Sequence, residues 1–479
     1  MLLSDTLYLV LDQGGQASRA LIFNDYGESL AQSRVEQKTD IGNTSPDPKW
    51  IVDSLRRAAT NALQQLTPQQ HCLPMRAALI CQRSSCLCWD RISGQPLTPL
   101  IGWQDKSGQS IIDQLYHHHP EIQRISGLVA NSHSPASKWA YLLSASAMIE
   151  AQRRYQLACG SLASFLIFHL CREHPFLIDR VNAARTQLYS LEARDWSNPL
   201  RALFDIPAEY LPDIRPSLYR YGTLELAGLR IPLKLVCGDQ PSALFSNGWP
   251  NPSALSVNMG TGAFIQMPLL VEAQERPQTR LLVAPAYSDL NDELLVLEGT
   301  VNGAATALNL TSLPLGLNYQ NSDSWRQRYQ PLPLFVNGVG GLGSPDWCSV
   351  ESGWQGLPPF DPKSKVLAVA ESILFLIQRN IIAMRDVGSF PTSIHLSGGL
   401  SQLDWMAQGL ANLSGLNVHR MTDPESSSRG AAWLLSRSAD WRRSSEQVFT
   451  PAPYSALPAR FDNWTQLLHA ALLAASNRR

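Results

Sequence analysis

The chain has few of the features that mark secreted, membrane-bound or nucleic-acid-binding proteins. Lys plus Arg (39) and Asp plus Glu (40) nearly balance over 479 residues, so no basic field is available for nucleic acid or for an anionic membrane. None of the eight cysteines forms a CxxC pair, and the opening Met-Leu-Leu-Ser-Asp-Thr lacks the positive start of a secretory signal. We therefore expect a cytoplasmic protein with reduced thiols that binds neither nucleic acid nor a membrane.

Uninterrupted apolar runs are also scarce. The most apolar stretch, residues 366–382, includes Glu371 and Arg379, which favours a buried helix over a membrane span. A chain this long exceeds one core and predicts at least two domains. The breaker-rich segment 247–253 suggests the boundary. We thus predict domains at 1–247 and 248–440, and a tail at 441–479 with a helix that Asp462 or Asn463 caps.

Three glycine turns, each placed directly after a short apolar run, are the strongest local signal. They are Asp12-Gln13-Gly14-Gly15-Gln16, Asn258-Met259-Gly260-Thr261-Gly262 and Ser397-Gly398-Gly399. Glycine lets the backbone approach a ligand closely, and the exposed N–H groups of such turns cradle anions. A single glycine after a strand usually marks only a turn. Three of them predict a phosphate-bearing ligand held between two halves of the chain.

Both halves show the same order of elements, a strand, a glycine turn and a strand, followed later by helix–strand units. This order predicts an α/β protein with mixed sheets and helices on their faces. The predicted strands are 7–11, 20–23, 29–34, 77–81, 233–237, 255–258, 263–267, 294–297 and 394–396, and the predicted helices are 48–66, 365–384 and 403–413.

Asp239 is the first candidate for chemistry. The strand 233–237, the turn at Gly238 and Pro241 in a first helical turn place it at a strand end beside a helix N-terminus. A carboxylate there can accept a proton from a hydroxyl that attacks phosphorus, and can help hold Mg²⁺. The structural alternative is a helix cap. Asp12 has the same two interpretations, a Mg²⁺ ligand acting through water or an Asx-turn residue.

These motifs together resemble the FGGY carbohydrate kinase family, and its glycerol kinases most closely. The family's usual Asp-x-Gly-Thr, Asn-Gln-Arg-Glu, Trp-Gln-x-x-Arg, Asn-Ala-Ser-Arg-Thr, Gly-Asp-Gln and Gly-Thr-Gly-x-Phe segments have counterparts here in the same order. The segments that carry the resemblance begin at Asp12, Cys81, Trp103, Asn182, Gly238, Gly260, Glu298, Gly341, Gly398 and Gly430. The resemblance implies two ribonuclease-H-like domains of the actin/hexokinase type around a central cleft.

The resemblance also implies cofactors and roles. The cofactors would be ATP and Mg²⁺, the acceptor a small sugar or polyol, and the assembly a homodimer. Asp239 would be the general base, and Asp12 and Asp239 would handle the metal. The implied cofactor-binding residues are Gly14, Gly15, Gln16, Arg19, Gly260, Thr261, Gly262, Asn309, Gly398, Gly399, Leu400 and Asp404. The implied acceptor-binding residues are Gln82, Arg83, Ser84, Trp103, His133, Asp239, Gln240 and Phe264, while Arg185 is interpreted as a structural ion-pair partner.

Four positions depart from the glycerol kinase pattern. Gly15 replaces Thr and Asp404 replaces Asn on the nucleotide side, and Ser84 replaces Glu and His133 stands for Tyr on the acceptor side. A site built to bond hydroxyls discriminates strongly when one partner changes, so we expect an acceptor other than glycerol. A catalytically impaired nucleotide- or sugar-binding protein of the same fold, and a phosphatase or ATPase on that fold, are the alternatives.

Overall fold

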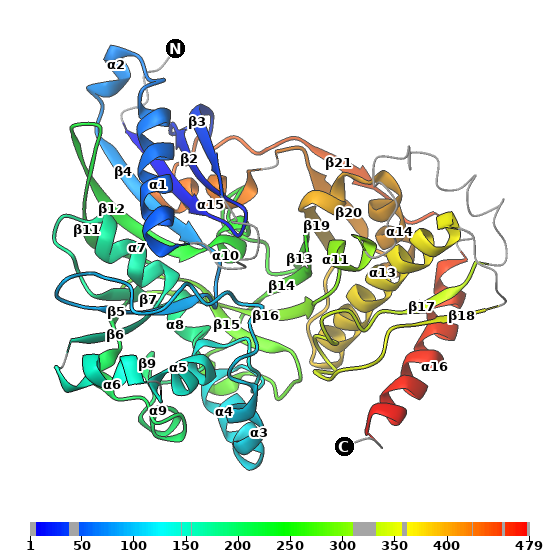
Figure 1. The fold of residues 1–479 in the computed structure, drawn as a ribbon. Coiled ribbons are helices and arrows are strands. Elements are labelled where there is room, and N and C mark those ends of the chain that lie inside the picture. Colours follow the sequence, from blue (N-terminus) through cyan, green and yellow to red (C-terminus); the bar gives the residue numbers. More distant parts are fainter. Residues whose placement is uncertain are drawn as a thin grey trace.

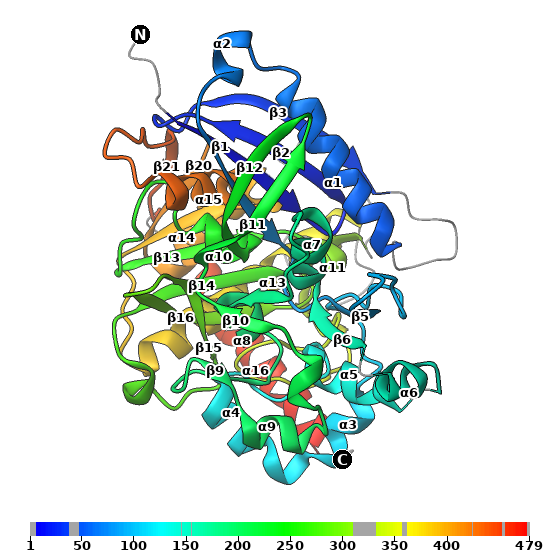
Figure 2. The ribbon, with the colours of Figure 1, turned by 90° about the vertical axis from the view of Figure 1, so that its left-hand side faces the viewer.

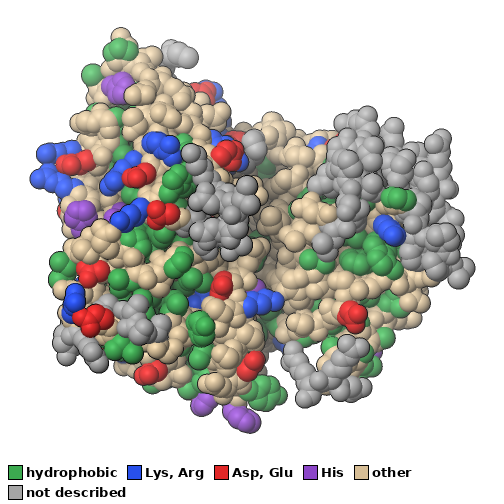
Figure 3. Space-filling view, in the orientation of Figure 1, with side chains coloured by type: hydrophobic (Ala, Val, Ile, Leu, Met, Phe, Trp, Pro, Cys, Tyr) green, Lys and Arg blue, Asp and Glu red, His purple; other side chains and the backbone are tan. Residues whose placement is uncertain are grey.

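The computed structural model describes residues 6–37, 47–144, 146–154, 156–309, 332–356, 362–423, 425–452 and 456–476. Two mixed β-sheets, one in each half of the chain, lie side by side with helices against their faces (Figure 1). The surface is hollowed between the two halves (Figure 3).

The first sheet has the strand order β11-β12-β4-β1-β2-β3. Its strands are β1 (Leu7–Gln13), β2 (Ala17–Phe23), β3 (Ser29–Glu36), β4 (Met75–Cys81), β11 (Leu218–Leu226) and β12 (Leu229–Gly238). The central strands β1, β4 and β12 are parallel, and every residue of β1 is buried. A strand covered on both faces is continuously apolar, as the run Leu7–Leu11 is.

Helices cover both faces of this sheet. One face packs against α1 (Pro48–Leu63), which Asp47 caps, and α7 (Leu162–Leu170). The other face packs against α15 (Ser426–Ser436), which comes from the far end of the chain, and Figure 2 shows α1 and α15 on opposite sides of the sheet. α15 lies directly on α10 (Asp239–Ala243), where Gly430 faces the Ser242 carbonyl with no room for a Cβ. The two halves are therefore interlocked through α10 and α15.

A long insertion between β4 and β11 forms the lower part of the first half in Figure 1. The remaining helices and strands of this half are α2 (Pro68–His71), β5 (Cys86–Asp90), α3 (Gln109–Gln114), α4 (His119–Ser126), α5 (Pro135–Leu143), α6 (Ser146–Arg153), β6 (Leu157–Ser161), β7 (Leu177–Asp179), α8 (Arg180–Ala184), β8 (Tyr189–Ser190), β9 (Asp195–Trp196), α9 (Asn198–Leu203) and β10 (Asp213–Arg215).

The second sheet has the order β15-β16-β14-β13-β19-β20-β21. Its strands are β13 (Ala254–Met259), β14 (Ala263–Leu269), β15 (Leu282–Ser288), β16 (Glu293–Val301), β19 (Ser393–Ser397), β20 (Asn417–Met421) and β21 (Glu446–Phe449). The other elements of this half are α11 (Ala305–Asn309), β17 (Leu334–Val336), β18 (Gly353–Gln355), α13 (Pro362–Asp386), the 3₁₀ turn η5 (Gly399–Gln402), α14 (Asp404–Ser414) and α16 (Leu457–Ser476).

The long helix α13 contains the apolar stretch noted in the sequence. In the part of the chain that is described, it is the one helix long and apolar enough to cross a membrane, and 83% of its apolar window is buried inside the protein. It packs against the second sheet and α14, and so forms part of the core.

The predicted start of the tail helix is wrong. α16 begins at Leu457, so neither Asp462 nor Asn463 is its cap. Apolar contacts explain the earlier start, because Leu457 is buried together with Trp464 and Leu468 in the second-half core. Trp464 also donates a hydrogen bond of 2.8 Å to the Phe335 carbonyl.

Candidate active site

Parallel strands bring the sequence motifs to common sheet edges. Gln13 of β1 and Gly238 of β12 both pair with Cys81 of β4, so the segments that follow these strands leave the first sheet side by side. In the second sheet Asn258 of β13 pairs with Ser397 of β19, which places the second and third glycine turns together. Carboxyl ends of parallel strands are where α/β sheets bind ligands.

A cleft of about 380 Å³ lies where these edges meet, and both halves line it. The predicted site residues that line it are Gly14, Gly15, Gln16, Arg19, Gln82, Arg83, Ser84, Trp103, His133, Asp239, Gln240, Thr261, Gly262 and Phe264. Residues of two glycine turns and all eight predicted acceptor-binding residues, Asp239 among them, therefore share one cavity.

The other predicted nucleotide-binding residues do not line this cleft. In the described part of the chain they are Gly260, Asn309, Gly398, Gly399, Leu400 and Asp404. Gly398 has φ +92° and packs so closely on the Met259 backbone that a Cβ would not fit, so it abuts the strand that precedes the second glycine turn. Asp404 is half exposed and forms an ion pair of 2.7 Å with Arg420. Asn309 is exposed at the end of α11.

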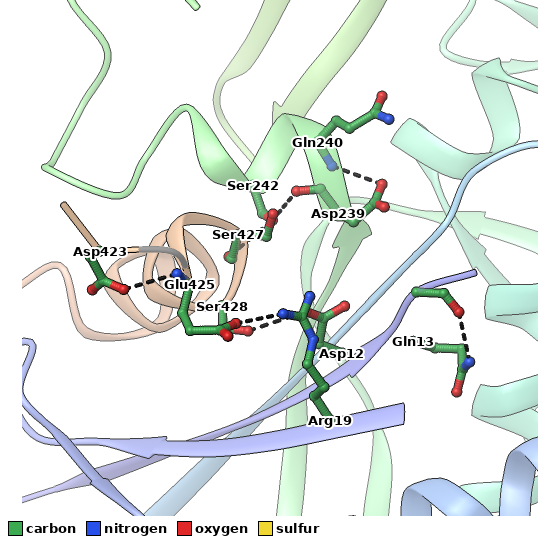
Figure 4. A network of polar contacts seen from close by, with 11 residues as sticks. Asp12, Gln13, Arg19, Asp239, Gln240, Ser242, Asp423, Glu425, Ser427 and Ser428 are labelled. Carbon is green, nitrogen blue, oxygen red and sulfur yellow. Dashed lines mark hydrogen bonds and ion pairs between the residues drawn. The ribbon is translucent and has the colours of Figure 1, made fainter. Parts of the chain in front are cut away.

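Asp239 is the first residue of α10, and Gly238 occupies the N-cap position. Its Oδ1 accepts a 2.8 Å hydrogen bond from the backbone N–H of Gln240, and the carboxylate is partly exposed to the cleft (Figure 4). Surrounding protein raises the pKa of Asp239, and the positive charge of Arg83 opposes that shift. The carboxylate thus has an elevated proton affinity at the edge of the cavity.

Asp12 is fully buried next to the cleft. Its Oδ2 bonds to Arg19 at 2.5 Å and accepts a long hydrogen bond from Ser428, whereas its Oδ1 has no hydrogen-bond partner among the described residues. Burial raises its pKa to about 6; Arg19 opposes the shift, and the negative charges of Asp239 and Glu425 add to it. An unpartnered carboxylate oxygen beside a second carboxylate fits a hard cation such as Mg²⁺, which needs few protein ligands.

Arg19 lines the cleft, as predicted for a phosphate contact, but two carboxylates hold it. Its guanidinium bonds to Asp12 and, at 2.7 Å, to Glu425 from the other half of the chain (Figure 4). Glu425 was not predicted, because nothing in the local sequence marks a residue 406 positions away as a partner.

A buried ion cluster supports the acceptor side of the cleft. Arg83 donates to the Gln240 side chain at 2.7 Å and to Glu298 at 2.8 Å, and Arg185 donates to the other Glu298 oxygen at 2.8 Å. Gln266 also donates to Glu298, which is fully buried. Although burial raises the pKa of Glu298, the two guanidinium groups hold it at about 2. Glu298 is thus an anion that orients both arginines, and Arg185 itself lines the cleft.

The role of Glu298 was not predicted, although a signal was present. It is a carboxylate in the interior of the apolar strand β16, and a buried charge there requires partners.

Trp103 and His133 stand together at the acceptor side. His133 Nδ1 bonds to the Trp103 carbonyl at 3.0 Å, and the rings lie 6.2 Å apart. The buried Lys138 ammonium donates to the carbonyls of Gly102 and His133, which ties the two segments together. Burial lowers the pKa of His133, and the charges of Lys106, Lys138 and Arg185 lower it further. His133 is therefore held as neutral imidazole near neutral pH.

Comparison with known proteins identifies the family. The model of the FGGY family of carbohydrate kinases, N-terminal domain, matches residues 7–246, and that of the C-terminal domain matches residues 255–439. The chain belongs to the FGGY family of carbohydrate kinases. It is thus a phosphotransferase with an alcohol group as acceptor, and the predicted family and fold are confirmed.

Relatives of this FGGY kinase include glycerol kinases. That of Acaryochloris marina is 28% identical over 98% of this chain and 99% of its own length, and that of Rhodopirellula baltica is 29% identical over 97% and 91%. Among solved structures, Plasmodium falciparum glycerol kinase with ADP has a TM-score of 0.84 at 20% identity, covering 98% of this chain and 99% of its own. Gluconate kinase from Lactobacillus acidophilus has a TM-score of 0.80 at 18% identity, with coverage of 99% and 100%.

Proposed function

We propose that this FGGY kinase transfers the terminal phosphate of ATP to a hydroxyl of a small sugar or polyol other than glycerol, with Asp239 as general base. One observation carries the proposal. The Asp239 carboxylate lines the same cleft as the turns at 14–16 and 261–262 and as the acceptor-side residues Arg83 and Trp103. Phosphoryl transfer needs these parts together, because it depends on positioning and charge stabilisation.

The environment of Asp239 suits proton transfer. A general base works best when its pKa approaches the working pH, and burial moves the pKa of Asp239 in that direction. Its Oδ1 is fixed by the Gln240 N–H, so the carboxylate is held in place to accept the acceptor's hydroxyl proton. The N–H groups of the glycine turns would hold the phosphates.

Asp12, with Asp239, is our proposed protein contact for Mg²⁺. The unpartnered Oδ1 of Asp12 and the mutual repulsion of the two carboxylates both favour a cation between phosphate and protein. When bound, the ion would neutralise charge on the phosphates.

The acceptor pocket argues against glycerol. Ser84 lines the cleft beside Arg83, where the glycerol kinase motif has Glu. The shorter neutral side chain leaves more room and removes one hydrogen-bond acceptor, so a small triol loses a partner. Structural neighbours named as glycerol, gluconate and xylulose kinases share this fold, so the fold accommodates acceptors of several sizes.

The decisive experiment replaces Asp239 by Asn and follows ADP release across a panel of polyols, ketoses and sugar acids. We expect kcat to fall by about 1,000-fold while calorimetry shows unchanged ATP affinity. Asp105→Asn is the matched control, because Asp105 is an exposed carboxylate outside the cleft lining. Full activity of the Asp239→Asn protein would exclude it as the base.

The same panel separates the alternatives. ATP binding without turnover for any acceptor would favour the impaired binding protein, to which Gly15, Ser84 and Asp404 point. ADP release that ignores the acceptor would favour an ATPase. We further propose a cytoplasmic homodimer with domains at 1–247 and 248–440, testable by light scattering and limited proteolysis.

A further inference from the structure

Hydrogen bonds link Asp239 to a cationic region of the acceptor pocket. The Asp239 carboxylate accepts from the backbone of Gln240, whose side chain accepts from Arg83, and Arg83 shares Glu298 with Arg185. An acceptor with its reactive hydroxyl at Asp239 therefore extends along Arg83 toward Arg185, since all of these residues except Glu298 line one cleft.

The charges in this region do not balance. Two guanidinium groups, Arg83 and Arg185, pair with one carboxylate, Glu298, and the charge of Arg83 also acts on the Asp239 carboxylate. The buried Lys138 adds a third cation, whose ammonium donates to backbone carbonyls, so three cations face two carboxylates and one positive charge is left over. Burial lowers the pKa of the neighbouring His133, and the charges of Lys106, Lys138 and Arg185 lower it further, in keeping with the excess of cations at this end.

Two buried donors in the cluster are unused. Arg83 Nη1 and Arg185 Nε have no hydrogen-bond partner in the described part of the chain, although Arg83 is only 6% exposed. A buried guanidinium N–H without an acceptor is costly, and the most effective partner for it is an anionic oxygen. The two arginines therefore have hydrogen-bonding capacity for one more anion in addition to Glu298.

Ser84 leaves that capacity free. It lines the cleft next to Arg83, with φ +64° and 8% exposure, and contributes a hydroxyl rather than a charge. A carboxylate at this position would neutralise the remaining guanidinium charge and repel an anionic acceptor.

We propose that the acceptor carries a carboxylate at the end remote from the phosphorylated hydroxyl, as an aldonic acid does, and that Arg83, Arg185 and Ser84 bind it. This inference rests on the proposed kinase function. The transferred group and the balance of the reaction are unchanged: the hydroxyl oxygen bonds to phosphorus, ADP leaves and Asp239 takes the proton.

The test compares acceptors in pairs that differ only in that group. ADP release is measured with glycerol and glycerate, erythritol and erythronate, xylitol and xylonate, and glucitol and gluconate, together with ketoses. We expect the best aldonate to exceed its matched polyol by about 100-fold in kcat/KM, because the carboxylate would pair with the two guanidinium groups that line the cleft. A ketose, or a polyol other than glycerol, as best acceptor would overturn this inference and leave the proposed function standing. Glycerol as best acceptor would overturn both this inference and the exclusion of glycerol in the proposed function. ADP release with none of them would overturn both the inference and the proposed function.

Paired variants at residue 84 isolate the charge. Ser84→Glu and Ser84→Gln add side chains of equal size at the same backbone conformation. We expect Ser84→Glu to reduce kcat/KM for the best aldonate about 100-fold more than Ser84→Gln, since like charges in a buried site are strongly disfavoured, and to affect the matched polyol no more than Ser84→Gln does. Equal effects of the two variants on the aldonate would contradict a carboxylate at this position. Circular dichroism of both variants establishes that they are folded.

Discussion

The two halves of the molecule are built on one strand order but carry different side chains at its functional edge. The first sheet runs β3-β2-β1-β4-β12 and the second β16-β14-β13-β19-β20, with the same strand directions and with α1 and α13 as corresponding crossover helices. Asp12 and Asn258 are each the next-to-last residue of the first strand in their half. Topology therefore fixes where the edge residues lie and leaves their chemistry free.

Asp12 and Asn258 have equivalent backbone positions but differ in charge. Asp12 is a buried carboxylate with a raised pKa, whereas Asn258 donates an ordinary 3.0 Å hydrogen bond to Ser397. Arg83 follows β4 and Asp239 follows β12 in the first half, whereas Gly398 and Gly399 follow β19, the counterpart of β4, in the second. We infer that the first half supplies the reacting charges and that the second supplies mainly close backbone approach. Besides Glu425, which pairs with Arg19, the main exception is Glu298, a buried anion that the second half contributes.

The largest effect is expected from that exception. Glu298→Gln leaves Arg83 and Arg185 buried without their counter-charge, and breaking such a cluster lowers the free energy of unfolding by about 3–5 kcal/mol. Urea denaturation measures the loss. Glu150→Gln is the control, because Glu150 and its partner Arg154 are both exposed to solvent. Equal losses for the two variants would show that the cluster has no special role.

The next prediction compares the equivalent edge residues directly. Asp12→Asn is expected to lower kcat by about 100-fold, whereas Asn258→Ala changes it less than about tenfold. The Asp12→Asn protein should nevertheless be more stable than the unsubstituted protein. The pKa of Asp12 in the folded protein, about 6, lies above its ordinary value, so folding disfavours its ionised form at neutral pH and removing the charge relieves that cost. A clear drop in Tm for Asp12→Asn would contradict this.

The strand and turn pattern was predictable because it is local. Leu7–Leu11 is apolar throughout since β1 is covered on both faces, and the resemblance placed Asp239 beside a cleft that the structure contains. The ion pairs were not predictable. Arg19 meets Glu425 across 406 residues and Arg83 meets Glu298 across 215, and such partners depend on the path of the whole chain. For the same reason the sequence did not show that α15 covers the first sheet.

The junction between the halves gives a third prediction. Gly430→Ala places a Cβ against the Ser242 carbonyl at the α10–α15 contact, and we expect overpacking to cost about 1–3 kcal/mol. Gly353→Ala is the control, because no atom lies within 4 Å of its would-be Cβ. Chemical denaturation of both proteins decides whether this contact couples the two halves.

The pH dependence of activity tests whether the titrating carboxylates are those of the first half, Asp12 and Asp239. Asp12 must be ionised to hold a cation and Asp239 to take a proton, and both pKa values are raised. Activity should therefore fall as the pH drops through about 6, by up to about tenfold per pH unit for each proton taken up. In the Asp12→Asn protein the remaining activity should lose part of that dependence. An unchanged profile would show that Asp12 does not titrate in the working range.

The smallest effect is expected at the outer part of the second half. Asp404 is half exposed and pairs with Arg420 at 2.7 Å at the start of α14. Exposed pairs contribute little, so Asp404→Asn should change the free energy of unfolding by less than about 1 kcal/mol, and raised salt should shrink the difference. ATP affinity is the sharper readout, because Asn restores the donor that the glycerol kinase pattern has at this position. Tighter ATP binding by Asp404→Asn would place this residue at the nucleotide, and unchanged binding would argue against a contact between this residue and the nucleotide.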